Sequence, residues 1–231
     1  MALNLTGDKN ILSKLLAQEN IQVRVSPMAR TASFNVEKRI LSLPDWKDIS
    51  NFLVDMLIVH EVGHALYTAS DDWTASFDKI AARLSDKLGV KNKKQISSQI
   101  HGYLNVIEDC RIDKLMRRRY PGTKKDYVEG HKELFERDFF NFKTDNIIID
   151  ELTLIDRINV LYKGGRFLNI KFNDDEMVFV NRIDGLQTFD DVERLSEDIY
   201  TYSFIEQKTQ PQEKLKTMLE DKSEDKGENS S

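Results

Sequence analysis

The stretch from Ser50 to Thr68 constrains the fold of this 231-residue chain more than any other segment. It reads SNFLVDMLIVHEVGHALYT, and its apolar side chains fall on most sides of a helix rather than along one stripe. A helix of this kind is stable only when other elements cover it on several sides. The sequence therefore predicts a central core helix over 50–68, with Asp45 or Asp48 as its N-terminal cap.

Short strands are predicted before this helix, and further helices after it. Ile21–Val25 alternates apolar and polar residues, and Thr31–Phe34 and Arg39–Leu43 flank a polar turn at 35–38, as in a half-buried sheet. Helical spacing predicts helices over 9–20, 75–88 (ending at Gly89), 96–119 (ending at Pro121-Gly122), 126–141, 150–163 and 189–206. The predicted fold class is α+β and mainly helical, with a small N-terminal β-sheet packed on the 50–68 helix.

The composition changes once, after Gln207. Residues 207–231 are polar and charged and contain no aromatic side chain, so they cannot bury enough apolar area to offset the entropy of ordering. We therefore predict one folded domain over 1–206, followed by a disordered tail or a linker over 207–231.

Bulk composition excludes several classes of function. The net charge is -5, whereas domains dedicated to nucleic acid are usually strongly basic, so no nucleic-acid partner is expected. The single cysteine, Cys110, allows neither an internal disulfide nor a four-cysteine zinc cluster. The N-terminus lacks the pattern of a signal peptide, and no apolar run is long enough to span a bilayer. A cytoplasmic protein that is not secreted and has no membrane partner is expected.

The core helix carries the run His60-Glu61-Val62-Gly63-His64. Two histidines four positions apart lie on one face of a helix, so both imidazoles can reach one metal ion at about 2.0–2.1 Å. Glu61 projects beside the metal and can take a proton from a water that the metal activates. Gly63 costs roughly 1 kcal/mol in mid-helix compared with alanine, which indicates a close approach of another group. These residue types predict a zinc site of the metallopeptidase kind, with Glu61 as the catalytic base.

A third protein ligand is expected on the helix over 96–119. Glu108 and Asp109 stand among apolar residues that this helix must bury, and a positive group is needed to compensate them. Glu108 is the preferred ligand, which would make the site gluzincin-like. Asp109 is the alternative, in which case Asp113, one turn later, could orient a zinc-bound histidine by a hydrogen bond. Pairing of both acids with Arg111 or Lys114 also remains open, and His101 is a candidate fourth ligand or a plain surface histidine.

Two features near the end of this helix have open interpretations. Basic residues gather around Pro121-Gly122, where they can stabilise the negative end of the helix dipole or contact an acidic partner or a phosphate backbone; they are Lys114, Arg117, Arg118, Arg119, Lys124 and Lys125. An oxyanion formed during peptide hydrolysis could be stabilised by Tyr120, Tyr127 or His131, and the sequence gives no geometric reason to choose among them.

The segments His60–Thr68 and Asn105–Asp113 together resemble the metallopeptidases encoded by T4-like phages of marine bacteria. Those proteins are similar to the T subunit of aerobic cobaltochelatase, which joins a comparable region to a von Willebrand factor A domain. The resemblance covers about Ile21 to Tyr202, including Arg117–Pro121 and Asn159–Gly165. No segment like a von Willebrand factor A domain follows in this sequence.

The resemblance implies a zincin-like fold. It also implies that His60 and His64 bind the metal, that Glu61 is the base, and that Glu108-Asp109 with Arg111 form a second motif. The expected function is a zinc-dependent peptidase acting on a protein or peptide substrate, in the host cytoplasm if the chain is phage-encoded. The alternative is a metal-stabilised assembly or adaptor module that cleaves nothing and works with a virion component or with an AAA+ ATPase. The ATPase partner rests on analogy alone.

Overall fold

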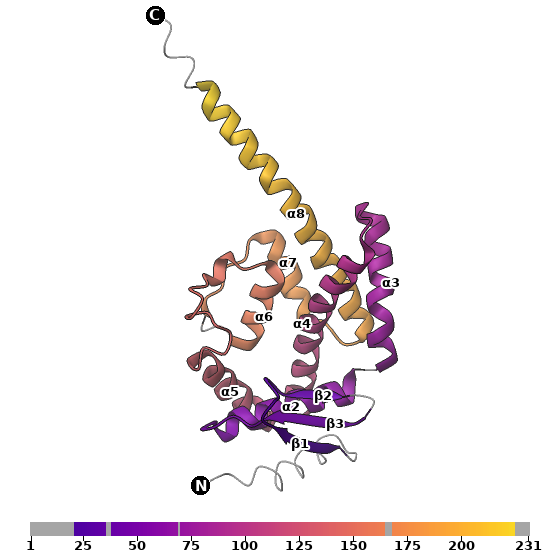
Figure 1. Cartoon of the computed structure of the whole chain (residues 1–231), viewed down its shortest axis with the longest axis vertical. Coiled ribbons are helices and arrows are strands. Elements are labelled where there is room, and N and C mark those ends of the chain that lie inside the picture. Colours follow the sequence, from indigo (N-terminus) through magenta and orange to yellow (C-terminus); the bar gives the residue numbers. More distant parts are fainter. Residues whose placement is uncertain (1–20, 36–37, 69, 165–167, 225–231) are drawn as a thin grey trace, which may run out of the picture.

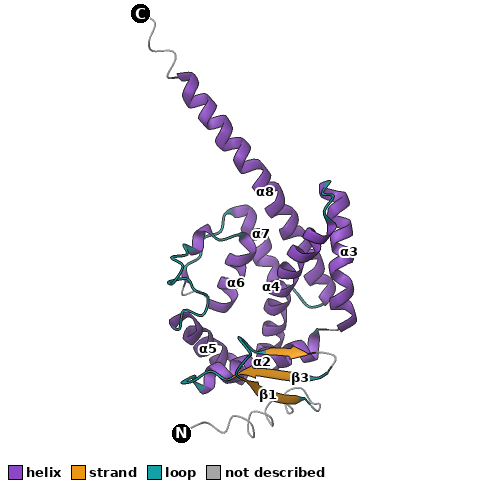
Figure 2. Ribbon diagram, in the orientation of Figure 1, coloured by secondary structure: helices purple, strands orange, loops and turns teal. Residues whose placement is uncertain are grey.

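The computed structural model describes residues 21–35, 38–68, 70–164 and 168–224. The helix predicted over 9–20 lies outside the described residues. The chain is mainly helical, and its sheet lies at the N-terminal end of the described chain, as Figure 2 shows. The predicted fold class is therefore confirmed at the level of a helical protein with a small N-terminal sheet.

The sheet has three strands, β1 (Gln22–Ser26), β2 (Ser33–Asn35) and β3 (Ile40–Pro44), in the order β1-β3-β2. β3 runs parallel to β1 and antiparallel to β2. The predicted polar turn joins β2 to β3, and the amide of Lys38 donates to Asn35 Oδ1 at 2.7 Å. β2 is at the edge of the sheet, so one of its sides pairs with no strand of the described chain.

The predicted core helix is α2 (Asn51–Tyr67). Its cap is Ser50, whose Oγ accepts from the amide of Leu53 at 3.1 Å, so the prediction of Asp45 or Asp48 is corrected. Asp48 instead lies in the turn that precedes the helix, where it has a φ of 56°. β2, β3, α4 and α5 all contact α2, which explains why this helix is apolar on most of its sides.

The remaining helices follow the predicted order, with one addition. They are α3 (Ser70–Leu88), α4 (Lys93–Arg119), α5 (Lys124–Glu136), α6 (Leu154–Gly164), α7 (Asp174–Ile183) and α8 (Phe189–Glu224), with single 3-10 turns at Pro121–Thr123 and Ile149–Glu151. Gly89 ends α3 with a φ of 65°, as its position predicted. The sequence analysis missed α7, although Asn173 and Glu176 form a capping box at its start.

α8 continues well beyond the predicted end of the folded domain. The sequence analysis placed a disordered tail or a linker over 207–231, and the described helix runs through Gln207 to Glu224. Figure 1 shows this helix extending away from the rest of the chain. Glutamate, lysine, glutamine and leucine are good helix formers, so the backbone is helical there even though the segment is polar.

Two hydrophobic cores meet along α4. One core lies among α3, α4, α6, α7 and α8 and includes Ile107 and Cys110 of α4. The other joins the sheet to α2 and α5 and includes Met116 of α4. A Cβ placed on Gly63 would lie 3.0 Å from Met116 Cγ, so the mid-helix glycine lets α2 and α4 approach closely.

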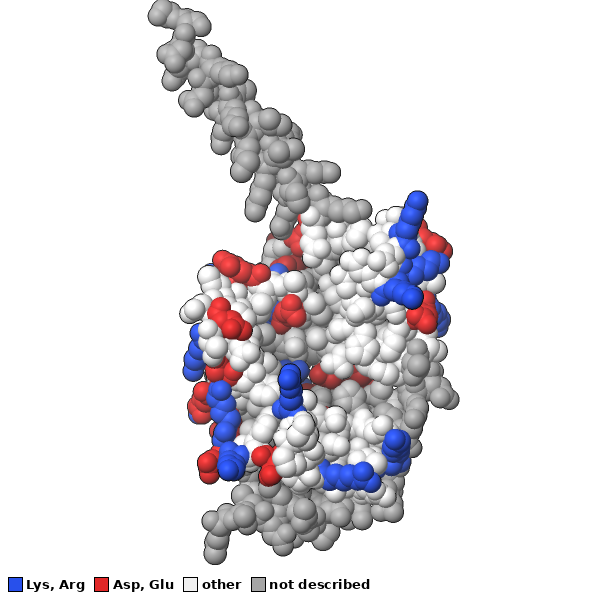
Figure 3. All heavy atoms as spheres, in the orientation of Figure 1, with Lys and Arg blue, Asp and Glu red and all other residues white. Residues whose placement is uncertain are grey.

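Charge on the outside is mixed. On the face that Figure 3 shows, basic and acidic side chains intermingle rather than gather into one patch of either sign. Within the described residues, no helix combines the length and the apolar character needed to cross a membrane.

Candidate metal centre

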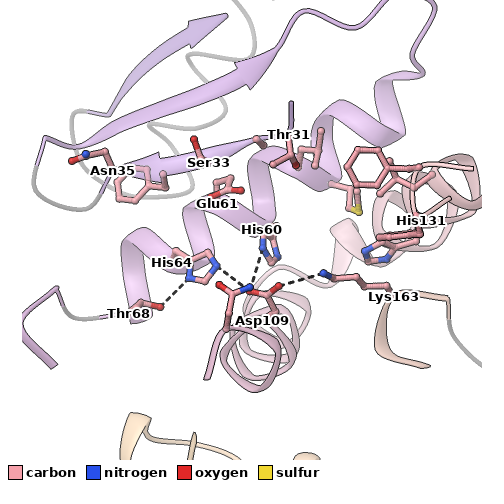
Figure 4. A pocket seen from close by; sticks show the side chains of 18 of the residues that line it. Thr31, Ser33, Asn35, His60, Glu61, His64, Thr68, Asp109, His131 and Lys163 are labelled. Atoms are coloured by element: carbon pink, nitrogen blue, oxygen red, sulfur yellow. Dashed lines mark hydrogen bonds and ion pairs between the residues drawn. The ribbon is translucent and has the colours of Figure 1, made fainter. Parts of the chain in front are cut away.

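Three potential metal ligands converge where α2 meets α4. His60 and His64 project from α2, and Asp109 projects from α4, as Figure 4 shows. Asp109 Oδ1 lies 3.6 Å from His60 Nε2 and 3.2 Å from His64 Nε2, and one atom from each residue lies within 4.8 Å of the others. Ligands bound tetrahedrally to zinc at about 2.0–2.1 Å are about 3.3 Å apart, so the spacing fits such an ion.

Glu108 does not join this cluster, and Asp109 takes the place that the sequence analysis preferred to give to Glu108. Successive residues of a helix point about 100° apart, so only one of the two carboxylates can face α2. The Glu108 side chain is fully buried and accepts two hydrogen bonds from Arg111, each 2.7 Å long. The compensating positive group for Glu108 is therefore an arginine.

Asp113 orients His60 from one helical turn beyond Asp109. His60 Nδ1 donates to Asp113 Oδ1 at 2.8 Å, and the Tyr127 hydroxyl donates to the same oxygen at 2.8 Å. With its Nδ1 proton committed to a carboxylate, the imidazole presents Nε2 to Asp109. This is the role that the Asp109 alternative assigned to Asp113.

A longer chain of hydrogen bonds orients His64. The Thr68 hydroxyl donates to Glu108 Oε1 at 2.5 Å, so its single proton is not available to the imidazole. His64 Nδ1, 3.1 Å from Thr68 Oγ1, must then be the donor in that contact, which leaves Nε2 free to bind a metal. Glu108 is thus connected to the cluster through Thr68, without being a ligand itself.

Thr68→Val tests this connection because valine has nearly the shape of threonine and lacks the hydroxyl. We expect the dissociation constant for zinc to rise about tenfold, since partners that orient a ligating histidine typically contribute 10- to 100-fold in affinity. Competition with a chromogenic chelator measures this change. Thr68→Ser keeps the hydroxyl and should stay near the wild-type affinity; equal losses in both variants would contradict the hydrogen-bonded chain.

The electrostatics of the cluster favour a positive charge. Burial by itself would lower the pKa of His60, but Asp113 and Asp109 raise it to about 10. Burial would raise the pKa of Asp109, yet His60, His64 and Lys163 hold it below its usual range. A divalent cation places more positive charge there than a proton does, and it displaces that proton on binding. The donor atoms and their surroundings therefore fit a divalent metal.

The cluster lies in the wall of a cavity of about 640 Å³. Glu61 lines the same cavity and, in Figure 4, lies between His60 and strand β2. Its side chain is buried, and burial raises the pKa of its carboxyl group even though both histidines oppose the shift. Residues 31–35, from β2 and the turn before it, form another part of the wall.

His131 and Lys163 approach the cluster from α5 and α6. Lys163 Nζ lies 3.4 Å from Asp109 Oδ2, the carboxylate oxygen that does not face the histidines. Burial lowers the pKa of His131 to about 4, so its imidazole is neutral at neutral pH. Of the three candidates for oxyanion stabilisation, His131 lines the cavity, whereas the Tyr127 hydroxyl is bound to Asp113.

The sequence analysis missed Lys163 and the role of Thr68, because only the folded chain brings α6 and the end of α2 beside α4. His101 is exposed, packs its ring against Phe77 and Trp73, and belongs neither to the cluster nor to the residues that line the cavity. Known proteins provide no further guide to the site: no protein family, no curated protein and no solved structure matches this chain.

Proposed function

We propose that this protein is a zinc-dependent peptidase. One observation supports the proposal above the others: two histidines and an aspartate converge beside a buried glutamate in the wall of a single cavity. Three protein ligands with room for a further one are typical of catalytic zinc, whereas structural zinc usually has four protein ligands. In this proposal His60, His64 and Asp109 hold the ion, and Glu61 is the general base.

Zinc supplies Lewis acidity, which polarises a carbonyl group and makes water more acidic. Glu61 accepts a proton from the attacking water and returns it to the nitrogen of the leaving amine. Asp113 and Thr68 keep the Nε2 atoms of the two histidines directed at Asp109. His131, as a neutral imidazole, donates a hydrogen bond to the oxygen on which negative charge develops.

β2 provides a place for an extended substrate. Its outer edge pairs with no strand of the described chain, and residues 31–35 line the cavity that contains Glu61. A peptide that adds to such an edge gains main-chain hydrogen bonds, and its alternate side chains point into the cavity. The substrate in this proposal is therefore a protein or peptide segment in extended conformation.

The wider context of the proposal comes from the resemblance found in the sequence. It includes four expectations: a zincin-like arrangement, kinship with the phage metallopeptidases, action in the cytoplasm and an AAA+ ATPase partner. Each can be tested separately from the chemistry, because none is needed for Glu61 to act as a base.

The variant Glu61→Gln tests the mechanism. It keeps the shape of the side chain and removes its basicity, so cleavage of a quenched fluorogenic peptide library should fall by about a hundredfold or more. Elemental analysis should still find one equivalent of zinc, because Glu61 is not a ligand in this proposal.

Glu151→Gln is the matched control, since it makes the same change at an exposed residue of a 3-10 turn. Activity that survives in Glu61→Gln would overturn the mechanism. A zinc-loaded wild-type protein that cleaves no peptide, and that unfolds when zinc is removed, would support the assembly-module alternative.

A further inference from the structure

A second and larger cavity borders the one described above. It has a volume of about 1140 Å³ and lies between α5 and the C-terminal ends of α4 and α6. His131 and Lys163 line both cavities, so the two spaces meet at these residues. We call the second cavity the basic groove, because six cationic side chains of the described residues line it: Lys114, Arg117, Arg118, Lys124, Lys132 and Lys163.

Part of this charge has a structural explanation. Lys114 Nζ donates to the carbonyl oxygens of Asp184 and Leu186, and Arg117 Nε donates to that of Asp113. Cations at the C-terminal end of α4 are also favoured by the helix dipole. Lys163 is also paired with Asp109, and Lys132 Nζ lies 3.9 Å from Glu136 Oε1. Arg118 and Lys124 are therefore the two of these six cations whose side chains make no hydrogen bond or ion pair with a described residue.

The helix dipole does not explain Lys124. It is the first residue of α5, at the end of the helix where the dipole is positive and a cation is unfavourable. Arg118 and Lys124 are both exposed at the groove, and Glu129 is the one acidic side chain among the described residues that line it. An excess of positive charge beside a helix N-terminus is complementary to an anionic partner.

Apart from the six cations, Glu129 and His131, the described residues of the groove wall are apolar or aromatic. Val128 is 50% exposed, and Tyr127, Phe135, Tyr162 and Leu168 line the same space. A partner that presents only phosphates would leave this apolar surface without a complement. A peptide in which acidic residues alternate with apolar ones would satisfy both parts of the wall.

We propose that the basic groove binds an acidic segment of the polypeptide substrate, adjacent to the bond that is cleaved. The direction of the substrate rests on the proposed function, because the segment reaches the metal cluster past His131 and Lys163. The binding itself does not require cleavage or metal, so it can be measured independently.

The test is a fluorescence anisotropy titration at low salt. The probe is a fluorescein-labelled peptide that alternates glutamate with leucine and phenylalanine, and the competitor probe has lysine in place of each glutamate. The full chain should bind the acidic probe at least about tenfold more tightly than the lysine probe, both with zinc and with EDTA. The double variant Arg118→Glu/Lys124→Glu should lose that affinity by about tenfold or more.

The matched control is Lys87→Glu/Lys94→Glu, which changes the net charge equally at exposed residues of α3 and α4 outside the groove. It should remain within about twofold of wild type, because distant exposed charges are screened. Equal losses in both double variants would show a non-specific charge effect and overturn the proposal. Tighter binding of a DNA oligonucleotide that is lost in Arg118→Glu/Lys124→Glu would also overturn it, in favour of a nucleic-acid surface.

The outcomes separate this proposal from the peptidase. Binding of the acidic probe without cleavage of any peptide would support the basic groove as a binding site and contradict the peptidase proposal. The opposite result is zinc-dependent cleavage of library peptides that shows no preference for acidic residues and does not change in Arg118→Glu/Lys124→Glu. It would support the peptidase proposal and contradict the role of the basic groove.

Discussion

In a chelator competition assay, Asp109→Asn is expected to raise the dissociation constant for zinc by more than about a hundredfold. This exceeds the loss of about 10- to 100-fold that is typical when a residue that only orients a ligand is changed. The variant removes a carboxylate whose Oδ1 lies 3.2 Å from His64 Nε2, and a neutral amide is a much poorer zinc ligand than a carboxylate. Elemental analysis of the purified variant should find well under one equivalent of the metal.

Glu108→Gln is the matched change at the neighbouring residue. Its carboxylate is bound to Arg111 and reaches His64 only through Thr68, so the affinity for zinc should fall by no more than about tenfold. The reverse ranking of the two variants would restore Glu108 as the third ligand. Circular dichroism must show both variants folded before their affinities are compared.

Arg111→Met is expected to lower the free energy of unfolding by about 3–5 kcal/mol, because it leaves Glu108 charged and buried without its partner. The exposed fractions of the two side chains are 4% for Arg111 and 0% for Glu108. The guanidinium also donates to the carbonyl oxygens of Tyr67 and Gln187, which therefore lose their partners too. Urea denaturation in EDTA measures the loss without a contribution from metal binding.

Arg83→Met provides the comparison at the surface. Arg83 makes two hydrogen bonds to Glu197, but its side chain is 41% exposed, and such pairs contribute about 0–1 kcal/mol. A similar small loss in Arg111→Met would mean that the arginine does not balance the buried charge of Glu108. The double variant Glu108→Leu/Arg111→Met should recover part of the stability, since no isolated charge remains.

The sequence was sufficient to predict α2 and the side of it that carries the histidines. Hydrophobic residues around most of the helix required a central position, and the spacing of His60 and His64 required a common face. Gly63 also predicted a close approach, which the structure shows to be the crossing of α4 at Met116. These features depend on local periodicity, which the sequence displays directly.

The third carboxylate could not be chosen in the same way. Glu108 and Asp109 are adjacent, and the choice depends on the rotation of α4 about its axis, which long-range packing determines. Asp109 and Asp113, one turn apart, face the histidines of α2, and Asn105, one turn before Asp109, lines the cavity. The spacing of three between Glu108 and Arg111 left their pairing open in the sequence, and the structure shows that this ion pair is what removes Glu108 from the site.

The path of α4 through both hydrophobic cores would give a metal ion bound at the cluster a mechanical role. The two imidazoles belong to a helix embedded in the core beneath the sheet, whereas Asp109 lies between Ile107 and Cys110 of the other core. An ion bound by all three side chains would link the two hydrophobic cores to each other. Its binding free energy would then resist their separation as well as local opening at the cavity.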